Sequence, residues 1–478
     1  MTAGRPTGIV LLACAALAGP VAAQRSGAPD AIDRFVTAEM ARQHIPGVAI
    51  AVVSRGTVVK ARGYGLANVE LKVPATDSSV FQSGSVGKQF TAAAVLLLVE
   101  DGKLGLDDPI TKLLPEGDSV WGGITIRHLL THTSGIHEYE EDDSSAVDMR
   151  HDYGEDALVR LAAARPLDFA PGTHWRYSNT GFMLLGVVIH RVSGRFYGDV
   201  LADRVFRPLG MRTARVISEA DIVPNRAAGY RLVDGTLKNQ EWVAPSLNTT
   251  ADGALHLTVH DLVAWDRALT EGRILRPESR AAMWTPATLQ DGGSVEYGFG
   301  WGVAPYRGRR AVGHTGSWQG FKAMIQRFPD DSLTVILLAN LAETLQRPIV
   351  YGVAGLYRPA LVPPHALAPR VDSAEAGRLA GDLEAVAAGR DTPSGRLVLR
   401  YRAALLEAER RSLAGLLAKH PATTFRGCDE LARLGLERHG ARVARSCYLS
   451  LHTPDQRVLY TFWLTGDQQV ADVSGYAY

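Results

Sequence analysis

The chain has 478 residues, 46% of them hydrophobic and 21% charged, which is the composition of a globular protein rather than a disordered or fibrous one. Lys and Arg total 51 and Asp and Glu total 50, so the formal net charge is +1. This balance excludes a dedicated nucleic-acid-binding protein, which needs a basic surface, and we expect no nucleic-acid partner. At about 150 residues per domain, the length predicts two or three domains.

The first 23 residues have the pattern of a signal peptide. Arg5 supplies a positive start, residues 9–17 form a short apolar core, and small residues precede Gln24. The apolar core is shorter than the roughly 20 residues of a membrane-spanning helix, so we expect no transmembrane segment after cleavage. The mature protein is therefore predicted to be periplasmic or secreted, from a bacterium. A lipoprotein modified at Cys14 and an uncleaved anchor are the alternatives.

Residues 29–357 carry the signals of one domain whose sheet is built from both ends of the segment. Strand-like runs occur early and late in it, with mainly helical signals between them. A helix over 85–102, apolar on every face in its second half, is expected to be fully buried. The other predicted elements are a helix at 29–43 and strands at 48–54, 57–63, 297–304, 311–315, 321–328 and 333–339.

A Pro-rich segment at 358–372, with four prolines, predicts a stiff, extended linker. Beyond it, residues 373–478 are predicted to form a small α+β domain. We expect this domain to be accessory, as a lid, a dimerisation surface or a cell-wall-binding module, and we expect Ser85 to stay reactive without it. Its predicted elements are helices at 374–388 and 398–417 and strands at 441–451, 458–464 and 470–476.

Cys428 and Cys447 are the only cysteines besides Cys14. In an oxidising compartment they can form a disulfide, and the alternative is a pair of buried free thiols. The chain has no C-x-x-C spacing of the kind that binds zinc.

The tetrapeptide Ser85–Lys88 stands where the predicted buried helix begins. A serine hydroxyl needs a nearby base to act as a nucleophile, and residues at i and i+3 share a helix face, so Lys88 is within reach of Ser85. Burial tends to lower the pKa of Lys88, which favours the neutral amine. The helix N-terminus adds N–H groups for a developing oxyanion. On its own the pattern is equally typical of a capping serine followed by a surface lysine.

Two further short motifs follow along the chain. At Tyr177–Asn179, a phenol held near an ammonium ion has its anion stabilised and can act as a general base, and Asn179 offers a donor and an acceptor to an amide substrate. At His314–Gly316, the end of a strand-like run offers a backbone N–H, and glycine allows close approach of a substrate. Either motif alone also fits an ordinary loop or turn.

The order S-x-x-K, Y-x-N, H-T-G resembles the serine β-lactamase and penicillin-binding-protein superfamily, and within it the class C-like branch. The resemblance covers about residues 30–360 and does not extend to the linker or the C-terminal domain. It implies the β-lactamase/transpeptidase-like α+β fold, an antiparallel sheet flanked by helices plus a helical subdomain. Further similar stretches lie at 125–135, 177–181, 208–211 and 297–301.

The resemblance also implies a mechanism. Ser85 attacks a carbonyl carbon, Lys88 and Tyr177 take its proton and later deliver it to the leaving group, and water hydrolyses the acyl-enzyme. Asn179 holds the substrate amide. Cofactors are not needed for this chemistry.

The third motif is expected to border the substrate. The backbone N–H groups of Ser317 and Ser85 form the implied oxyanion hole, with Thr315 and Gly316 beside the substrate. His314 departs from the lysine of many relatives: with an unperturbed pKa of about 6.5 it is mostly neutral at pH 7 and brings no permanent charge to a substrate carboxylate. Relatives with histidine here resemble D-aminopeptidases and esterases.

Together these patterns predict an exported serine hydrolase that forms an acyl-enzyme at Ser85 and cleaves an amide or an ester, above all a D-amino-acid-containing peptide or a small ester. The partner is thus a small-molecule or peptide substrate, cell-wall-derived peptides included. A class C-like β-lactamase or DD-carboxypeptidase, and a non-catalytic penicillin-binding sensor, are the alternatives. The sequence leaves the oligomeric state open.

Three other types of site fit the sequence only in part. His128, His132 and His137 have zinc-like spacing, but no H-E-x-x-H glutamate accompanies them, and we predict no metal site. A phosphate-binding loop before Lys88 fails because Gln82 stands where its first glycine belongs. An α/β-hydrolase nucleophile elbow fails because its first glycine is also missing.

Overall fold

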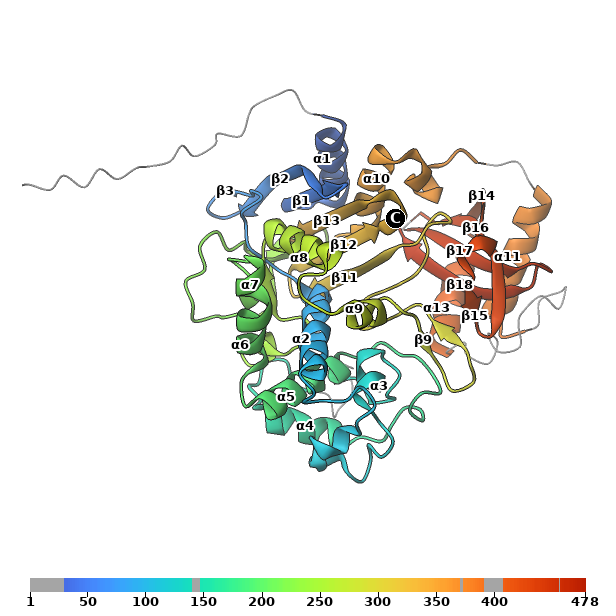
Figure 1. Cartoon of the computed structure of the whole chain (residues 1–478). Helices are drawn as coiled ribbons and strands as arrows, with labels where there is room; N and C mark the ends of the chain where they lie inside the picture. Colours follow the sequence, from blue (N-terminus) through green and yellow to red (C-terminus); the bar gives the residue numbers. More distant parts are fainter. Residues whose placement is uncertain (1–29, 140–146, 370–372, 391–406, 455) are drawn as a thin grey trace, which may run out of the picture.

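The computed structural model describes residues 30–139, 147–369, 373–390, 407–454 and 456–478. The predicted signal peptide and the first part of the helix predicted at 398–417 lie outside these residues. Figure 1 shows the central sheet with its helices and, beside it, a second sheet built from the C-terminal strands. Within the described residues, no helix combines the length and the apolar character needed to span a membrane.

Six antiparallel strands form the central sheet, in the order β11-β12-β13-β1-β2-β3. The early and late strands meet where β1 pairs with β13, so the prediction of one sheet built from both ends is confirmed. Strand β11 lies at the edge of the sheet. The six strands are β1 (Gly47–Ser54), β2 (Thr57–Asn68), β3 (Val73–Pro74), β11 (Val312–Trp318), β12 (Phe321–Phe328) and β13 (Leu333–Ala339).

Helices cover both faces of this sheet (Figure 1). The helices α1 and α10 pack against each other on one face, and α2 and α8 belong to the apolar core on the other. Strand β1 is buried on both faces over nearly all its length, which is why its sequence is continuously apolar rather than alternating. The four helices are α1 (Ala31–Gln43), α2 (Lys88–Glu100), α8 (Val259–Glu271) and α10 (Gln346–Tyr357).

Further helices form a subdomain around α2, whose residues Lys88–Leu98 are all buried, as the apolar sequence predicts. The predicted start at Ser85 falls in a 3₁₀ turn, η1 (Gly84–Gly87), that precedes the α-helix. The helices here are α3 (Ile126–Leu130), α4 (Glu155–Ala163), α5 (Asn179–Ser193), α6 (Tyr197–Leu201), α7 (Arg207–Leu209) and α9 (Pro277–Met283). Short strands accompany them: β4 (Phe81–Gln82), β5 (Arg215–Val216), β6 (Tyr230–Val233), β7 (Thr236–Asn239), β8 (Leu255–Leu257), β9 (Ala287–Thr288) and β10 (Ser294–Val295).

The prediction of a strand at 297–304 is wrong. This segment is a loop held by single bridges such as Gly302↔Gly313. Gly300 has a φ of +74°, and a Cβ there would lie 2.7 Å from the carbonyl oxygen of Lys88. The loop therefore passes over the start of α2 at a distance that only glycine permits, with a backbone conformation that a regular strand does not contain.

The described residues of 373–478 contribute a separate apolar core and a sheet in the order β14-β16-β17-β18, with β15 beside β16. Strand β14 was not predicted, because it is polar along much of its length and is interrupted by a bulge near Gly427. Residues 358–369, the described part of the predicted linker, contain two 3₁₀ turns and a buried Leu361, so this part is not the extended chain that its prolines predicted. The elements are α11 (Ser373–Ala387), α13 (Glu407–Leu417), β14 (Ala422–Glu430), β15 (Glu437–Arg438), β16 (Ala441–His452), β17 (Arg457–Thr465) and β18 (Val470–Ala477).

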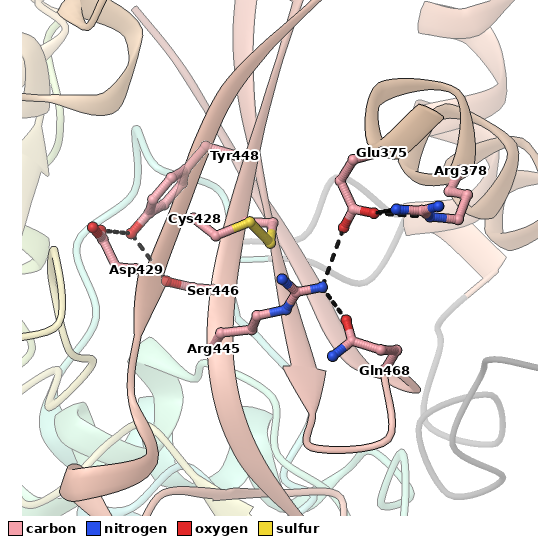
Figure 2. Close-up of a disulfide and its surroundings, with 9 residues drawn as sticks. Glu375, Arg378, Cys428, Asp429, Arg445, Ser446, Tyr448 and Gln468 are labelled. Atoms are coloured by element: carbon pink, nitrogen blue, oxygen red, sulfur yellow. Dashed lines mark hydrogen bonds and ion pairs between the residues drawn. A yellow bond between two sulfur atoms is a disulfide. The ribbon is translucent and has the colours of Figure 1, made fainter. Parts of the chain in front are cut away.

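A disulfide joins the first two strands of this C-terminal sheet (Figure 2). Cys428 on β14 stands directly opposite Cys447 on β16, so the structure selects the disulfide from the two alternatives left by the cysteine count. In the chain-entropy model, closing a loop of this length stabilises the folded state by about 3 kcal/mol. The bond ties the edge strand β14 to the middle of the sheet.

Two ion pairs connect the C-terminal sheet to residues 296–307 of the first domain. Arg307 pairs with Asp429, with 2.7 Å between Nε and Oδ2. Arg438 pairs with Glu296, and its guanidinium lies 3.8 Å from the ring centroid of Trp463. Because Glu296 directly precedes the loop that crosses α2, the second contact reaches toward the residues of the candidate site.

Candidate active site

Ser85 lies in the 3₁₀ turn η1, between strand β4 and helix α2. This turn packs against the edge strand β11. A Cβ on Gly84 would lie 2.4 Å from the backbone nitrogen of Ser317, and a Cβ on Gly316 would lie 1.9 Å from the carbonyl oxygen of Ser83. The two backbones therefore approach so closely that only glycine fits at both places. This approach brings the backbone nitrogen of Ser317 next to Ser85, as the implied oxyanion hole requires.

Lys88 is the first residue of α2, and its side chain is fully buried. Its Nζ donates to Ser85 Oγ at 3.0 Å, so the contact expected from the i, i+3 spacing is present. The same Nζ donates to Asn179 Oδ1 at 2.7 Å and to the carbonyl oxygen of Asp252 at 2.5 Å. The bonds to Asn179 and Asp252 hold the amino group against the hydroxyl of Ser85. In this position Lys88 can exchange a proton with Ser85.

Tyr177 lies beside the same amino group, with Lys88 Nζ 4.9 Å from its ring centroid. Burial raises the pKa of Tyr177, and the lowering by the Lys88 charge and by the nearby Ser85 hydroxyl does not offset it. Lys88 thus stabilises the phenolate, as the sequence argument expects, but the cost of burying an anion is larger and sets the net direction of the pKa. In the resting site the phenol is protonated.

Asn179 is the first residue of α5, and Ser178 caps this helix by accepting a hydrogen bond from Gly181 N at 3.0 Å. The Asn179 side chain uses Oδ1 to accept from Lys88, and its backbone N–H donates to Glu138 Oε2 at 2.5 Å. A carboxylate at a helix N-terminus is stabilised there. Asn179 is thus held from both sides, and it positions Lys88 in addition to bordering the cavity.

His314 is buried in β11 with both ring nitrogens occupied. Its Nε2 accepts from the hydroxyl of Tyr297 at 2.8 Å, and its Nδ1 lies 2.5 Å from the carbonyl oxygen of Thr315, to which it donates. Burial and the nearby charges of Lys88 and Arg347 lower the pKa of His314 to about 3. The ring is therefore neutral at pH 7, as the sequence argument predicted, and it has no proton on Nε2 to offer a substrate.

A small cavity opens in front of Ser85. Ser85, Asn179 and Ser317 line it, Lys88 contacts Ser85 and Asn179, and Tyr177 lies beside Lys88. The ring centroids of Tyr177 and His314 are 6.1 Å apart. Thr315 and Gly316 lie on the same edge strand, and the carbonyl oxygen of Gly316 is occupied by Gln346 Nε2 at 2.9 Å. The residues that line the cavity are Gly84, Ser85, Asn179, Leu247, Thr250, Asp252, Gly253, Ala254, Ser317 and Trp318.

Three residues of the site were not singled out from the sequence. Asp252 is buried, accepts from Lys88 through its carbonyl oxygen and from the Tyr139 hydroxyl through Oδ2 at 3.2 Å. Tyr297 falls in a stretch noted for its resemblance, yet only the fold shows that it binds His314. Lys322 donates to Ser317 Oγ at 2.7 Å. Of these three residues, only Lys322 could have been noticed in the sequence, because it follows the short turn after the third motif.

The histidines considered as metal ligands each have another partner. His128 closes a capping box with Thr125, and His132 Nδ1 accepts from the backbone N–H of Ser178 at 3.1 Å. His137 Nδ1 lies 2.9 Å from Asp168 Oδ1. Across the described parts of the chain, the only set of three candidate ligands within 4.8 Å of one another contains the two disulfide-bonded cysteines, whose sulfurs are no longer free to bind a metal.

The fold and the site together define a serine hydrolase with a lysine-assisted nucleophile. The model of the Beta-lactamase family matches residues 32–352, and the chain belongs to this family. The antiparallel sheet with its helical subdomain is the β-lactamase/transpeptidase-like α+β fold that the resemblance implied.

Individual relatives carry more specific names. The chain is 32% identical over 316 residues to penicillin-binding protein 4* of Bacillus subtilis, covering 60% of this chain and 68% of that protein. It is 30% identical over 325 residues to a D-aminopeptidase of Gluconobacter oxydans, covering 66% of this chain and 59% of that protein. The D-amino acid amidase of Ochrobactrum anthropi has a similar structure, with a TM-score of 0.59, 26% identity and coverage of 69% and 98%. The chain thus spans less than two thirds of the D-aminopeptidase.

Proposed function

We propose that this protein is an exported serine hydrolase that cleaves an amide or ester through a Ser85 acyl-enzyme, with D-amino-acid-containing peptides or small esters as its substrates. One observation carries the proposal: Lys88 Nζ binds Ser85 Oγ, Asn179 Oδ1 and the carbonyl oxygen of Asp252 at once. This buried arrangement places an amino group that can exchange a proton with the nucleophile beside the cavity.

The proposed reaction begins when Ser85 Oγ bonds to the substrate carbonyl carbon and its proton passes to Lys88, present at that moment as the neutral amine. The oxyanion accepts hydrogen bonds from the backbone N–H groups of Ser85 and Ser317. The protonated phenol of Tyr177 donates to the leaving nitrogen or oxygen as its bond to carbon breaks, and Lys88 returns a proton to Tyr177. Water then repeats the sequence on the acyl-enzyme and frees Ser85.

Two observations support an amide or ester of a D-amino acid over a β-lactam. Relatives named D-aminopeptidase and D-amino acid amidase match the catalytic segment. The neutral ring of His314 supplies no charge for a carboxylate at the third motif. A β-lactamase or penicillin-sensitive peptidase is the second candidate, favoured by the identity with penicillin-binding protein 4*.

The deciding experiment gives the mature protein three classes of acyl donor in parallel: a penicillin, D- and L-alanine 4-nitroanilides, and short 4-nitrophenyl esters. Intact-protein mass spectrometry follows the adduct while absorbance follows product. Steady turnover of the D-anilide or the esters with no penicillin adduct supports the proposal. A penicillin adduct on Ser85, or steady loss of the drug, moves the function to the second candidate, and the Ser85→Ala variant is the matched control.

A protein that acylates once and stops with every donor is a sensor, and that result overturns the hydrolase. Export is a separate part of the proposal, because it rests on residues 1–23, which the structure does not describe. Expression of the full chain in a Gram-negative host, followed by N-terminal sequencing of the periplasmic fraction, tests it. A mature N-terminus near Gln24 supports export, and an uncleaved cytoplasmic product overturns it.

A further inference from the structure

The short segment 137–139, which follows α3 in the chain, is bound to the first turn of α5. Thr180 Oγ1 donates to the first carbonyl oxygen of this segment at 2.9 Å and accepts from the backbone N–H of Tyr139 at 2.8 Å. Glu138 Oε2 accepts from the backbone N–H of Asn179 at 2.5 Å. Because Thr180 is fully buried, water does not compete for its two bonds. The segment is therefore fixed to the end of α5 that carries Asn179.

The hydroxyl of Tyr139 connects the same segment to Asp252. It donates to Asp252 Oδ2 at 3.2 Å, and Tyr139 is only 7% exposed and Asp252 only 6%. A buried carboxylate is costly without hydrogen-bond donors, so this phenol stabilises the side chain of Asp252 where it lies. The backbone carbonyl oxygen of the same residue accepts from Lys88 Nζ.

The two residues held in this way are the two that fix the amino group of Lys88 beside the nucleophile. Asn179 Oδ1 lies 2.7 Å from Nζ, and the carbonyl oxygen of Asp252 lies 2.5 Å from it. They belong to segments far apart in the chain, the start of α5 and the stretch before β8. The third bond of the amino group, 3.0 Å to Ser85 Oγ, depends on where these two acceptors hold Nζ.

We propose that Glu138 and Tyr139 form a bridge that positions Lys88 for the acylation of Ser85, each residue of the bridge holding one acceptor of the lysine amino group. This inference rests on the proposed function only for the identity of the nucleophile, and it holds for any acyl donor. Neither residue of the bridge is among those that line the cavity. Both are therefore positioning residues, and their loss is expected to lower kcat and to leave KM for a small ester nearly unchanged.

The first test removes the carboxylate of the bridge. Glu138→Ala takes away the acceptor of the Asn179 N–H, and we expect kcat for 4-nitrophenyl acetate to fall on the order of 10–10²-fold, because small displacements of positioned groups are costly. Glu138→Gln keeps a side-chain oxygen as an acceptor and is expected to retain most of the rate. In an Asn179→Ala background, Glu138→Ala is expected to have little further effect, since the side chain it positions is gone.

The second test removes only the hydroxyl of Tyr139. Tyr139→Phe is expected to lower kcat about tenfold. Its matched control is Tyr64→Phe, because Tyr64 also donates from a buried phenol to a buried carboxylate, Asp33 Oδ1 at 2.8 Å, beside α1 on the opposite face of the central sheet. Both variants lose one similar hydrogen bond and are expected to have similar melting temperatures. A Tyr139→Phe variant with the kcat of Tyr64→Phe overturns the bridge.

A measurement without turnover separates the bridge from the proposed function. A fluorophosphonate reacts once with an activated serine: Ser85 Oγ bonds to phosphorus, its proton passes to Lys88, and fluoride leaves. Intact-protein mass spectrometry follows the rate of this labelling. Slower labelling of Glu138→Ala and Tyr139→Phe than of the wild-type protein and Tyr64→Phe supports the bridge, even where the protein hydrolyses no amide or ester.

Two results overturn the bridge. One is an equal labelling rate in all four proteins. The other is a crystal structure of Glu138→Ala in which Lys88 Nζ keeps its bonds to both Ser85 and Asn179, because the amino group is then positioned without the carboxylate.

Discussion

The hydroxyl of Tyr297 donates a 2.8 Å hydrogen bond to Nε2 of His314 and so joins the loop that crosses α2 to the edge strand of the central sheet. Burial keeps the phenol of Tyr297 protonated by raising its pKa well above the ordinary value. The imidazole of His314 donates from Nδ1 to the carbonyl oxygen of Thr315, so both of its nitrogens have a hydrogen-bond partner. His314 is thereby fixed as one neutral tautomer that shapes the wall of the site.

This neutrality predicts a pH profile without a contribution from His314. Its pKa of about 3 means that it stays uncharged above that value, and no step between pH 5 and 8 requires it to lose a proton. We expect the acidic limb of kcat/KM to have the same midpoint in the wild-type protein and in His314→Gln, although the rate itself falls. A midpoint that moves by a full pH unit contradicts the assignment.

Replacing His314 by lysine tests the charge argument directly. His314→Lys places a second ammonium group near Lys88 and removes the acceptor for Tyr297, so we expect slower turnover of neutral esters. Relative to those esters, acylation by a carboxylate-bearing penicillin is expected to improve. Competition between penicillin and a neutral ester for Ser85 measures this ratio, and no gain shows that pocket shape rather than charge sets the preference.

Substitutions of the residues that transfer protons are expected to lower kcat by different amounts. Ser85→Ala is expected to abolish turnover, and Lys88→Met and Tyr177→Phe are each expected to lower kcat by on the order of 10²–10⁴-fold, the usual share of general acid–base catalysis. Thermal unfolding of the Lys88 variant separates catalysis from folding, because that side chain is fully buried. A Tyr177→Phe variant with wild-type rates shows that the second motif is misassigned.

The C-terminal domain is predicted to influence the site, contrary to the expectation that it is a dispensable accessory. Arg438 holds Glu296, the neighbour of Tyr297, and Tyr297 holds His314. We expect Arg438→Gln to lower kcat/KM by on the order of 10–10²-fold, because small displacements of positioning groups are costly in catalysis.

The matched control for Arg438 is Arg307→Gln. Arg307 forms an ion pair across the same contact, with Asp429, but has no link to Tyr297. Both variants are expected to lower the melting temperature to a similar extent, and only Arg438→Gln is expected to lower the rate. Equal losses of kcat/KM in the two variants would mean that the contact between the domains only stabilises the fold. Arg438→Lys keeps the charge and is expected to restore part of the rate.

Buried and half-buried neutral histidines predict a loss of stability in mild acid. Burial lowers the pKa to about 4 for His256, His365 and His439, to about 3 for His314, and well below the ordinary value for His132. The unfolded chain binds these protons near pH 6.5, so the stabilisation is complete above that pH and is lost as the pH falls toward 4. Each group contributes a slope of at most about 1.4 kcal/mol per pH unit.

Urea unfolding at pH 7.5, 6 and 5 measures this slope. His256 is a suitable probe, since it is buried and its Nδ1 has no hydrogen-bond partner among the described residues. His256→Asn is expected to be less stable at pH 7.5 and to show a shallower pH dependence. An unchanged slope in this variant means that His256 is protonated in the folded protein.

Much of the fold and the core of the site could be predicted from local sequence. The order of strands and helices, the buried helix α2 and the contact between Ser85 and Lys88 follow from patterns that repeat every two or three to four residues. The family resemblance rested on the same short motifs. The missed strand β14 and the wrong strand at 297–304 are segments where a bulge or a glycine breaks the regular pattern.

Only the tertiary structure decided what surrounds the motifs. Lys88 binds Asn179, 91 positions away, and Asp252, 164 positions away, and the register of β11 against β12 sets Lys322 on Ser317. Burial also decided the net direction of the pKa of Tyr177, over the opposing effect of Lys88. A helical spacing follows from backbone geometry alone, whereas these contacts and desolvation costs depend on which distant segments pack together.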